Sequence, residues 1–223
     1  MTERNILAVD TSTNTLRLAL RFGGDRLVKS QDAVEKSHGQ VLLKRMAELL
    51  ASADLKIGDL EAIAVAVGPG SFTGLRIGLA AIKGMVMALE IPIVPVTVFE
   101  VAAARLREAD QRVHVIVPLN REECVRCAVE IDGTIGEPMV ARYDELAAVI
   151  GNDAVAGIGV DMRTVFASHA GHDLSDRVQY DAADLIYLAE ARLAAGYEGA
   201  EVATLEPLYL QKSQAEIKFD RLH

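Results

Sequence analysis

The sequence predicts an α/β protein made of two duplicated lobes, each with a mixed sheet and covering helices. Three observations support this prediction. Short alternating strand patterns open the chain, and helix and strand patterns then alternate along it. The opening pattern returns roughly 110 residues later, which indicates a weak internal duplication. Hydrophobic residues make up 51% of the chain, enough for one sizeable core or two small lobes around a shared cleft.

The first half begins with three predicted strands. Residues 6–9 are an apolar run that ends in a cluster of turn-forming residues at 10–14. Leucines then alternate with other residues over 16–21, which is the pattern of a half-buried strand, and the Gly-Gly-Asp turn at 23–25 leads into a third strand at 27–28. We therefore expect a three-stranded meander at the start of the chain.

Helices and strands alternate after the meander. Apolar residues spaced by three and four from Gln40 onward predict an amphipathic helix, for which Ser37 is a candidate cap. Residues 62–67 are almost continuously apolar, as in a strand covered on both faces, and after a glycine-rich turn a helix is expected through about Leu89. Strand, turn and helix together form the first half of a β-α-β unit with parallel strands.

The second half carries the same signals more sparsely. Residues 113–117 form a strand-like run, residues 125–129 alternate as the leucines of the first half do, and Asp132-Gly133 occupies the place of the first glycine turn. The remaining expected elements are a strand at 91–96, helices at 98–107, 144–150 and 182–195, and a strand at 155–160.

The composition argues against several classes of function. The net charge is -9, there is no Trp, and aromatic residues are scarce, so the chain lacks the cations and stacking platforms with which proteins hold nucleic acid unaided. Contact with RNA is therefore expected only through a partner. Two cysteines do not form a disulfide framework, and no apolar run approaches the roughly 20 residues of a membrane span, so we expect a cytoplasmic protein.

The most unusual stretch is GPGSFTGLRIG at residues 68–78, where a strand meets a helix. Free backbone N–H groups at a helix start suit an anion. The stretch nevertheless lacks the lysine of a Walker A loop after Gly74, and Thr73 replaces the third glycine of the dinucleotide fingerprint. A tight turn with close packing and an anion site remain equal alternatives.

The helix after this turn has an unusually flat face. Gly74, Gly78, Ala81 and Ala88 recur at helical spacing, and glycine is unfavourable inside a helix, so a packing reason is expected. The face suits close approach either of the chain's own sheet or of another subunit. Both interpretations stay open at this point.

Other chemical signals are weak. His38 has Leu42 where a helical histidine pair would place its second metal ligand, and Cys124 and Cys127 lie on an alternating strand that directs them to opposite faces. Ser71 lacks the flanking glycines of a nucleophile elbow. The sequence therefore marks no catalytic residue and no metal ligand.

Asp10 is the one carboxylate placed where open sheets bind ligands, and the hydroxyl residues Thr11 and Ser12 follow it. It either holds a metal-bound phosphate or caps its turn. The equivalent place in the second half reads Pro118-Leu119-Asn120 and has no carboxylate. A symmetric two-loop phosphate clamp would therefore lack one acidic partner.

Three stretches resemble the TsaB family: residues 6–12 (ILAVDTS), residues 37–40 (SHGQ) and, above all, the glycine-rich residues 68–78. The resemblance is strong over about residues 5–100, weak afterwards, and returns at PLYL, residues 207–210. It implies the actin-like (ASKHA) fold of sugar kinases, Hsp70 and actin. The implied division is an N-terminal lobe at 1–98, a degenerate C-terminal lobe at 99–205, and a tail at 206–223 that packs back on the first lobe.

The resemblance also implies a function. Such proteins are non-catalytic scaffolds that work with TsaD, a metal-bearing paralogue, and the ATPase TsaE to transfer a threonylcarbamoyl group to adenosine 37 of tRNAs that read codons beginning with A. It implies that tRNA is reached only through the complex and that the chain has no cofactor of its own. Weak or interfacial ATP or ADP binding and a homodimer of the free chain both stay open.

Residue by residue, the resemblance assigns two groups. Asp10, Thr11 and Ser12 correspond to a vestigial nucleotide loop. One departure from the family is Leu119-Asn120-Arg121, where the family usually has Asp-Ala-Arg. The implied partner interface consists of Gly70, Ser71, Phe72, Thr73, Gly74, Arg76, Gly78, Ala81 and Gly84.

Three other functions remain as alternatives. An ATP-dependent small-molecule kinase or nucleotidase of the same fold would need paired acidic residues in both lobes, and only the first lobe offers one. A glycoprotease-like metallopeptidase would need the missing histidine pair. A stand-alone homodimer with a structural or regulatory interaction role is the third.

Overall fold

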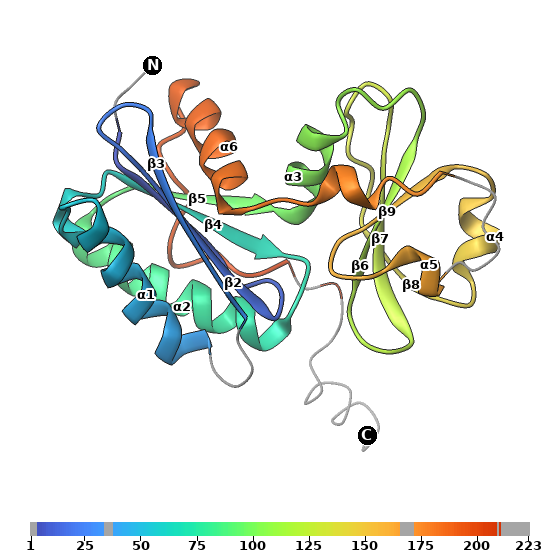
Figure 1. Cartoon of the computed structure of the whole chain (residues 1–223), viewed down its shortest axis with the longest axis horizontal. Coiled ribbons are helices and arrows are strands. Elements are labelled where there is room, and N and C mark those ends of the chain that lie inside the picture. Colours follow the sequence, from blue (N-terminus) through green and yellow to red (C-terminus); the bar gives the residue numbers. More distant parts are fainter. Residues whose placement is uncertain (1–3, 34–37, 166–171, 209, 211–223) are drawn as a thin grey trace.

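The first lobe is built on a mixed sheet. The structure, a computed structural model, describes residues 4–33, 38–165, 172–208 and 210. The predicted meander is confirmed, and two strands parallel to the first extend it in the order β3-β2-β1-β4-β5 (Figure 1). The strands are β1 (Ile6–Asp10), β2 (Thr15–Phe22), β3 (Arg26–Ala33), β4 (Ala62–Gly68) and β5 (Ile93–Thr97).

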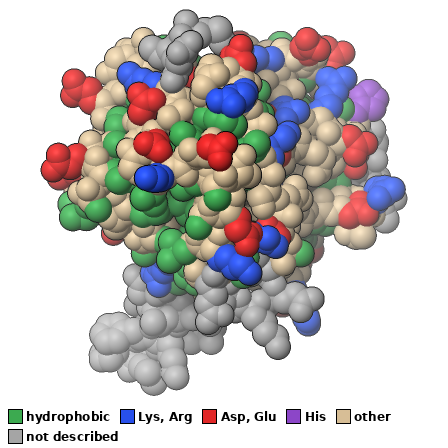
Figure 2. Space-filling view, turned by 60° about the vertical axis from the view of Figure 1, so that its left-hand side comes forward, with side chains coloured by type: hydrophobic (Ala, Val, Ile, Leu, Met, Phe, Trp, Pro, Cys, Tyr) green, Lys and Arg blue, Asp and Glu red, His purple; other side chains and the backbone are tan. Residues whose placement is uncertain are grey.

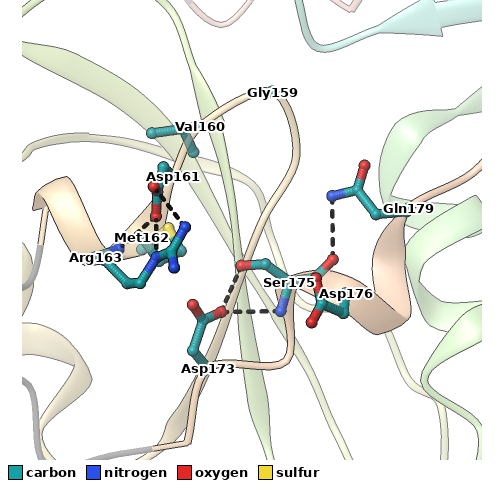
Figure 3. A pocket seen from close by; sticks show the side chains of 9 residues that line it. All are labelled: Gly159, Val160, Asp161, Met162, Arg163, Asp173, Ser175, Asp176 and Gln179. Carbon is teal, nitrogen blue, oxygen red and sulfur yellow. Dashed lines mark hydrogen bonds and ion pairs between the residues drawn. The ribbon is translucent and has the colours of Figure 1, made fainter.

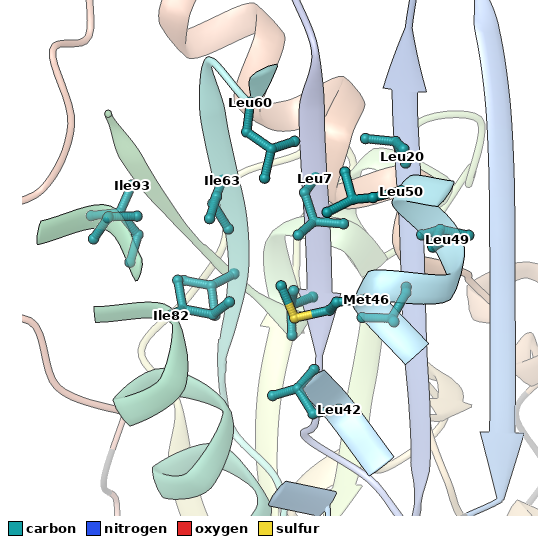
Figure 4. Close-up of a cluster of buried hydrophobic side chains, with 14 of the residues drawn as sticks. Leu7, Leu20, Leu42, Met46, Leu49, Leu50, Leu60, Ile63, Ile82 and Ile93 are labelled. Carbon is teal, nitrogen blue, oxygen red and sulfur yellow. The ribbon is translucent and has the colours of Figure 1, made fainter. Parts of the chain in front are cut away.

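Two helices, α1 (His38–Ser52) and α2 (Phe72–Leu89), cover one face of this sheet (Figure 1). Their apolar stripes meet the strands in one buried cluster, in which Leu50 of α1 lies beside Leu7 and Ile82 of α2 lies beside Ile63 (Figure 4). A short 3-10 turn, η1 (Ile57–Asp59), precedes β4. Helix α2 is the one described helix whose length and apolar composition would suffice to cross a membrane, and here its apolar side is buried in this core.

The opposite face of the first sheet is covered by α6 (Ala182–Ala194), which comes from near the end of the chain (Figure 1). The expectation of a half-buried β2 is therefore wrong, because Ala19 and Arg21 on its second face are buried as well. The buried Arg21 forms an ion pair with Glu190 of α6. Although α6 lies within the range 99–205, it packs on the sheet of the first lobe.

The second lobe repeats the arrangement with four strands in the order β8-β7-β6-β9, an antiparallel meander and one parallel strand. This match of order and direction confirms the predicted duplication. The strands are β6 (Val113–Pro118), β7 (Glu123–Val129), β8 (Met139–Arg142) and β9 (Ala154–Gly157), and the helices are α3 (Val98–Arg105), α4 (Leu146–Ile150), α5 (Met162–Val165) and the 3-10 turn η2 (Ser175–Val178).

The second lobe also shows where the sequence pattern was least informative. Strand β8 was not predicted: its apolar run is only Met139 to Ala141, and most of its residues are exposed. Strand β9 ends at Gly157, earlier than the predicted 155–160, because the chain then turns at Gly159, where φ is +73°. Helix α3 packs on one face of this sheet, and α4 and α5 pack on the other.

The chain passes between the lobes more than once. It leaves the first lobe between β5 and α3 and returns between η2 and α6. The segment after α6 then runs along the first lobe, where the N–H of Leu208 donates to the carbonyl of Val67 (2.7 Å), and Leu210 packs on the core of the second lobe. The predicted tail thus contacts the first lobe at Leu208, whereas 211–223 lies outside the described residues.

Candidate functional site

The glycine-rich turn lies against the first polar turn of the chain. The N–H of Ser71 donates to the carbonyl of Ser12 (2.6 Å), and Ser71 Oγ accepts from the N–H of Gly74 (3.2 Å), which caps α2. A Cβ added at Gly70 would overlap the carbonyl oxygen of Ser12. Two turns that are far apart in the sequence are therefore held together by backbone contact.

The first turn of α2 and the turn after it pack equally closely on Thr11. A Cβ at Gly74 would overlap the Thr11 carbonyl oxygen, and a Cβ at Gly78 would overlap its Oγ1. Both glycines are buried. The family resemblance implies a partner interface that includes Gly74 and Gly78, but both face their own chain, because Thr11 occupies the space that a side chain would need.

Most of the remaining interface candidates lie on the exposed side of α2, whereas Ala81 packs partly against the core. Thr73, Arg76 and Gly84 are exposed, and Ala81 is half-buried. Phe72 is 36% exposed, and the Arg76 guanidinium lies 3.7 Å from the centre of its ring. Outside the adjoining backbone of α2, no atom of the described residues lies within 4 Å of a Cβ added at Gly84, so the described part of the chain gives this glycine no packing reason.

The vestigial-loop candidates are buried. Asp10 is 0% exposed, and Thr11 and Ser12 are nearly so. The N–H of Ser12 donates to one oxygen of Asp10 (2.8 Å), and the Tyr180 hydroxyl donates to the other (2.9 Å). Burial and the Asp10 charge raise the pKa of Tyr180 well above its usual value, which keeps the phenol protonated as the donor.

Arg17 completes the surroundings of Asp10. Its Nη1 lies 3.2 Å from Asp10 Oδ2 and 2.9 Å from Thr13 Oγ1, and its guanidinium lies 5.1 Å from the ring centre of Tyr180. Sequence reasoning missed both Arg17 and Tyr180. The signal for Arg17 was available, because Asp10 and Arg17 are direct cross-strand partners in the β1–β2 hairpin. Tyr180 lies 170 residues from Asp10, and no local pattern marks it.

A cleft of about 360 Å³ separates the polar turns of the two lobes. The turn after β1 and the turn after β6 face each other across it, as the predicted duplication requires. None of the described residues that line the cleft carries a charge, and Asp10 is not among them. Its lining consists of residues 12–14, 70–73, 117–120 and 158–159.

Asn120 follows Leu119, the position at which the family usually has an aspartate. Its side chain has a structural role. Its side-chain oxygen accepts from the N–H groups of Glu122 and Glu123, and its Nδ2 donates to the Glu123 carboxylate (2.8 Å). The side chain thus closes its own turn. The second-lobe wall of the cleft is left with uncharged groups, Leu119 among them.

A second pocket, of about 500 Å³, lies within the second lobe after β9 (Figure 3). Asp161 pairs with Arg163 (3.0 Å), whose hydrogen bonds lower the Asp161 pKa, and Asp173 accepts from the N–H of Ser175 (2.9 Å). The carboxylates of Asp161 and Asp173 are thus engaged with neighbours on their own loops. Among the described residues, no group of three or more His, Cys, Asp or Glu side chains is placed to hold a metal.

The two cysteines lie on opposite faces of β7, as the alternation predicts. Cys127 is buried on the α3 side of the sheet and Cys124 on the α4 side. Burial raises the pKa of each thiol to about 11, so both are neutral at physiological pH. The candidate cap Ser37 lies outside the described residues, as does the side chain of His38.

Comparison with known proteins gives a consistent assignment. The model of the family described as TsaD, tRNA N6-adenosine threonylcarbamoyltransferase, matches residues 28–219. The protein named tRNA threonylcarbamoyladenosine biosynthesis protein TsaB of Haemophilus influenzae is 31% identical over 119 residues, which cover 52% of this chain and 50% of the relative. The protein of that name from Bacillus subtilis is 38% identical over 105 residues, 47% of this chain and 46% of the relative. The chain spans about half the length of these curated relatives.

Solved structures support the same assignment over a longer stretch. The structure titled YeaZ from Pseudomonas aeruginosa is similar with a TM-score of 0.74 and 26% identity, and the match covers 93% of this chain and 100% of that one. A Bacteroides thetaiotaomicron protein described as having an actin-like ATPase fold is similar with a TM-score of 0.52 and 8% identity, over 83% of this chain and 96% of that one. The second likeness concerns the fold alone, and it confirms the predicted actin-like class.

Proposed function

We propose that this chain, which belongs to the family of the tRNA N6-adenosine threonylcarbamoyltransferase TsaD and is similar to TsaB proteins, is a non-catalytic subunit of the TsaB kind in tRNA threonylcarbamoyladenosine synthesis. In this role it binds a TsaD-like, metal-bearing paralogue, and a TsaE-like ATPase joins the pair. The pair transfers the threonylcarbamoyl group to N6 of adenosine 37 in tRNAs that read codons beginning with A.

One observation carries the proposed partner surface, namely the exposed Gly84 in the middle of α2. A glycine inside a helix costs about 1 kcal/mol of stability relative to alanine. Gly74 and Gly78 are explained by Thr11, but no described residue occupies the space beside Gly84. A backbone from another subunit that packs closely at this position would explain the missing side chain.

The surroundings of Gly84 suit a protein partner. Met87, one turn farther along α2, is 70% exposed, and Leu43 of α1 is 55% exposed. Between α1 and α2 lies an apolar groove of about 320 Å³, lined by Leu43 and Met85 among others. Figure 2, turned to bring the α1 side of the first lobe forward, shows hydrophobic side chains gathered among separated charges. Exposed apolar surface of this kind is typical of a protein interface.

Two further observations support a role without catalysis. The Asp10 carboxylate is engaged by Arg17, Ser12 and Tyr180, and the described lining of the cleft offers no charged group for acid–base or phosphoryl chemistry. The net charge of -9 disfavours direct RNA binding, so in this proposal tRNA contacts the complex through the partner. In this proposal the system works in the cytoplasm, and ATP or ADP binds either weakly to this chain or at the interface of the complex.

The experiment is size-exclusion chromatography with light scattering on this chain alone and mixed with the TsaD-like protein of the same organism. A heteromer of the two chains supports the proposal, and reconstituted tRNA modification that requires this chain then tests the activity. Two separate peaks, with and without the TsaE-like protein and ATP, would overturn the proposed partnership. A stable homodimer in those same fractions would instead favour the stand-alone interaction protein.

A further inference from the structure

The environment of Asp10 joins parts of the chain that belong to different lobes. Tyr180 lies in the connection from η2 in the second lobe to α6 on the first sheet, and its ring packs against the buried cores of both. Its hydroxyl donates to Asp10 Oδ2 (2.9 Å) and lies 3.4 Å from Ser12 Oγ. The segment that connects the two lobes is thus hydrogen-bonded to the polar turn after β1.

These groups do not fit a metal-bound nucleotide. The oxygens of Asp10 accept from the Ser12 N–H, the Tyr180 hydroxyl and Arg17, and the carboxylate is 0% exposed. A divalent cation needs carboxylate oxygens that face the ligand, and phosphates need cations or aimed donors. The described lining of the cleft supplies neither a carboxylate nor a Lys or Arg side chain.

Arg17 instead supplies the positive charge beside Asp10. Its side chain is 15% exposed, it reaches both Asp10 and Thr13, and it lies over the ring of Tyr180. A guanidinium is permanently charged and offers several donors in a fixed plane. It therefore remains beside the carboxylate whether or not anything enters the cleft.

We propose that Asp10, Arg17 and Tyr180 form a latch that fixes the angle between the two lobes without a ligand. In two-lobed proteins that close around a ligand, contacts with the ligand set the angle between the lobes. In this chain, internal contacts at Tyr180 hold the segment that connects the two lobes. The surface around α2 therefore keeps one fixed position relative to the second lobe. The latch is a property of the chain alone and is tested without any partner.

Pulsed EPR distance measurement between the lobes provides the test. Spin labels are attached at Lys44→Cys on α1, where the side chain is 74% exposed, and at Val149→Cys on α4, which is 54% exposed. Cys124 and Cys127 stay unlabelled because they are buried and their pKa values are raised to about 11. Circular dichroism confirms that each variant is folded.

Tyr180→Phe and Arg17→Gln are compared in this labelled background. The matched control is Tyr187→Phe, which removes the hydroxyl of a tyrosine that is 58% exposed on α6. We expect one narrow distance distribution in the parent and in the control, unchanged by Mg²⁺ and ATP. In both latch variants the distribution should broaden, or shift by more than the parent width.

Two results would overturn the latch. One is a folded Tyr180→Phe or Arg17→Gln protein that keeps the parent distribution. The other is a parent whose distribution shifts or narrows when Mg²⁺ and ATP are added, since that would show that a ligand sets the angle. If neither latch variant folds, the response of the parent distribution to Mg²⁺ and ATP decides the question, because that measurement needs no substitution at Arg17 or Tyr180.

Discussion

Gly78 and Thr11 pack so closely that a Cβ at position 78 would overlap Thr11 Oγ1 and lie 3.0 Å from its Cγ2. The turn after β1 is thereby pressed into the side of α2. This contact gives the glycine a role inside the chain. It also separates Gly78 from Gly84, which is exposed on the same helix and beside which an added Cβ would meet no atom of the other described residues.

Substitution by alanine should have opposite effects on the stability of the chain at Gly78 and at Gly84. Gly78→Ala forces Thr11 to move, and overpacking of this kind costs about 1–3 kcal/mol in the free energy of unfolding. Gly84→Ala should stabilise the isolated chain by up to about 1 kcal/mol, because alanine favours the helix and meets open space. Urea unfolding measures both. Equal effects of the two substitutions would contradict the assigned roles.

Gly84→Leu should weaken association with the TsaD-like partner while the chain stays folded. The added side chain points away from the chain's own core and would hold a closely packed partner backbone at a distance. Met87→Glu should act in the same direction by placing a charge in the apolar surface. Titration calorimetry gives the dissociation constants, which we expect to rise at least about tenfold, equivalent to about 1.4 kcal/mol.

The control for these interface variants is Val149→Glu, which changes a residue of similar character, 54% exposed, on the second lobe. It should leave the dissociation constant unchanged. If Val149→Glu weakens binding as much as Met87→Glu does, the partner does not distinguish the α2 surface from the rest of the molecule, and the proposed interface is wrong.

Arg17→Met should destabilise the chain strongly, because it leaves the buried Asp10 carboxylate without its cation. Breaking one side of a buried ion pair costs about 3–5 kcal/mol. The double variant Asp10→Asn with Arg17→Met should lose less stability than the sum of the losses in the two single variants, because no unpaired charge remains. Urea unfolding of the four proteins measures this coupling, and strictly additive losses would show that the pair is not coupled.

His114 should make stability depend on pH near neutrality. It is buried on β6, where Nε2 lies 3.1 Å from Asp153 Oδ2 and Nδ1 lies 3.1 Å from Arg126 Nη1. Burial lowers the pKa of His114 below its usual value, and the Arg126 charge lowers it further against the opposing effect of Asp153. Because Arg126 can only donate, Nδ1 accepts and the neutral ring donates from Nε2.

The sign of the His114 effect follows from its lowered pKa. Above about pH 6.5 the ring is neutral in both the folded and the unfolded chain and contributes no pH dependence. Below that pH the unfolded chain takes up the proton first, so stability falls until the pH reaches the lower pKa of the folded state. Unfolding free energies measured from about pH 7.5 to 5.5 should therefore decline less in His114→Gln. An identical decline in both proteins would rule out this contribution.

Both thiols should be inert in the folded chain. Cys124 and Cys127 are buried, and their raised pKa values leave little thiolate at pH 8. A thiol reagent such as dithionitrobenzoate should react slowly with the native protein and rapidly, with two equivalents, once urea unfolds it. Fast reaction of the native chain would contradict the burial of these side chains.

Much of the local structure was predictable from the sequence. The alternation at 16–21, the continuous apolar run at 62–67 and the glycine-rich turn at 68–78 predicted β2, β4 and the start of α2. These patterns are informative because the periods of strands and helices are properties of short stretches. The same holds for the duplication, whose two meanders repeat one local pattern.

Tertiary structure alone decided what depends on distant contacts. Gly74, Gly78 and Gly84 all lie within α2, and the packing of Thr11 shows that the first two face inward. Likewise, Asp10 at a strand end suits either a ligand or its own turn. The approach of Tyr180, 170 residues away, determines that its carboxylate is buried among internal donors. Local sequence fixes backbone preferences, whereas burial and partner choice arise when distant segments meet.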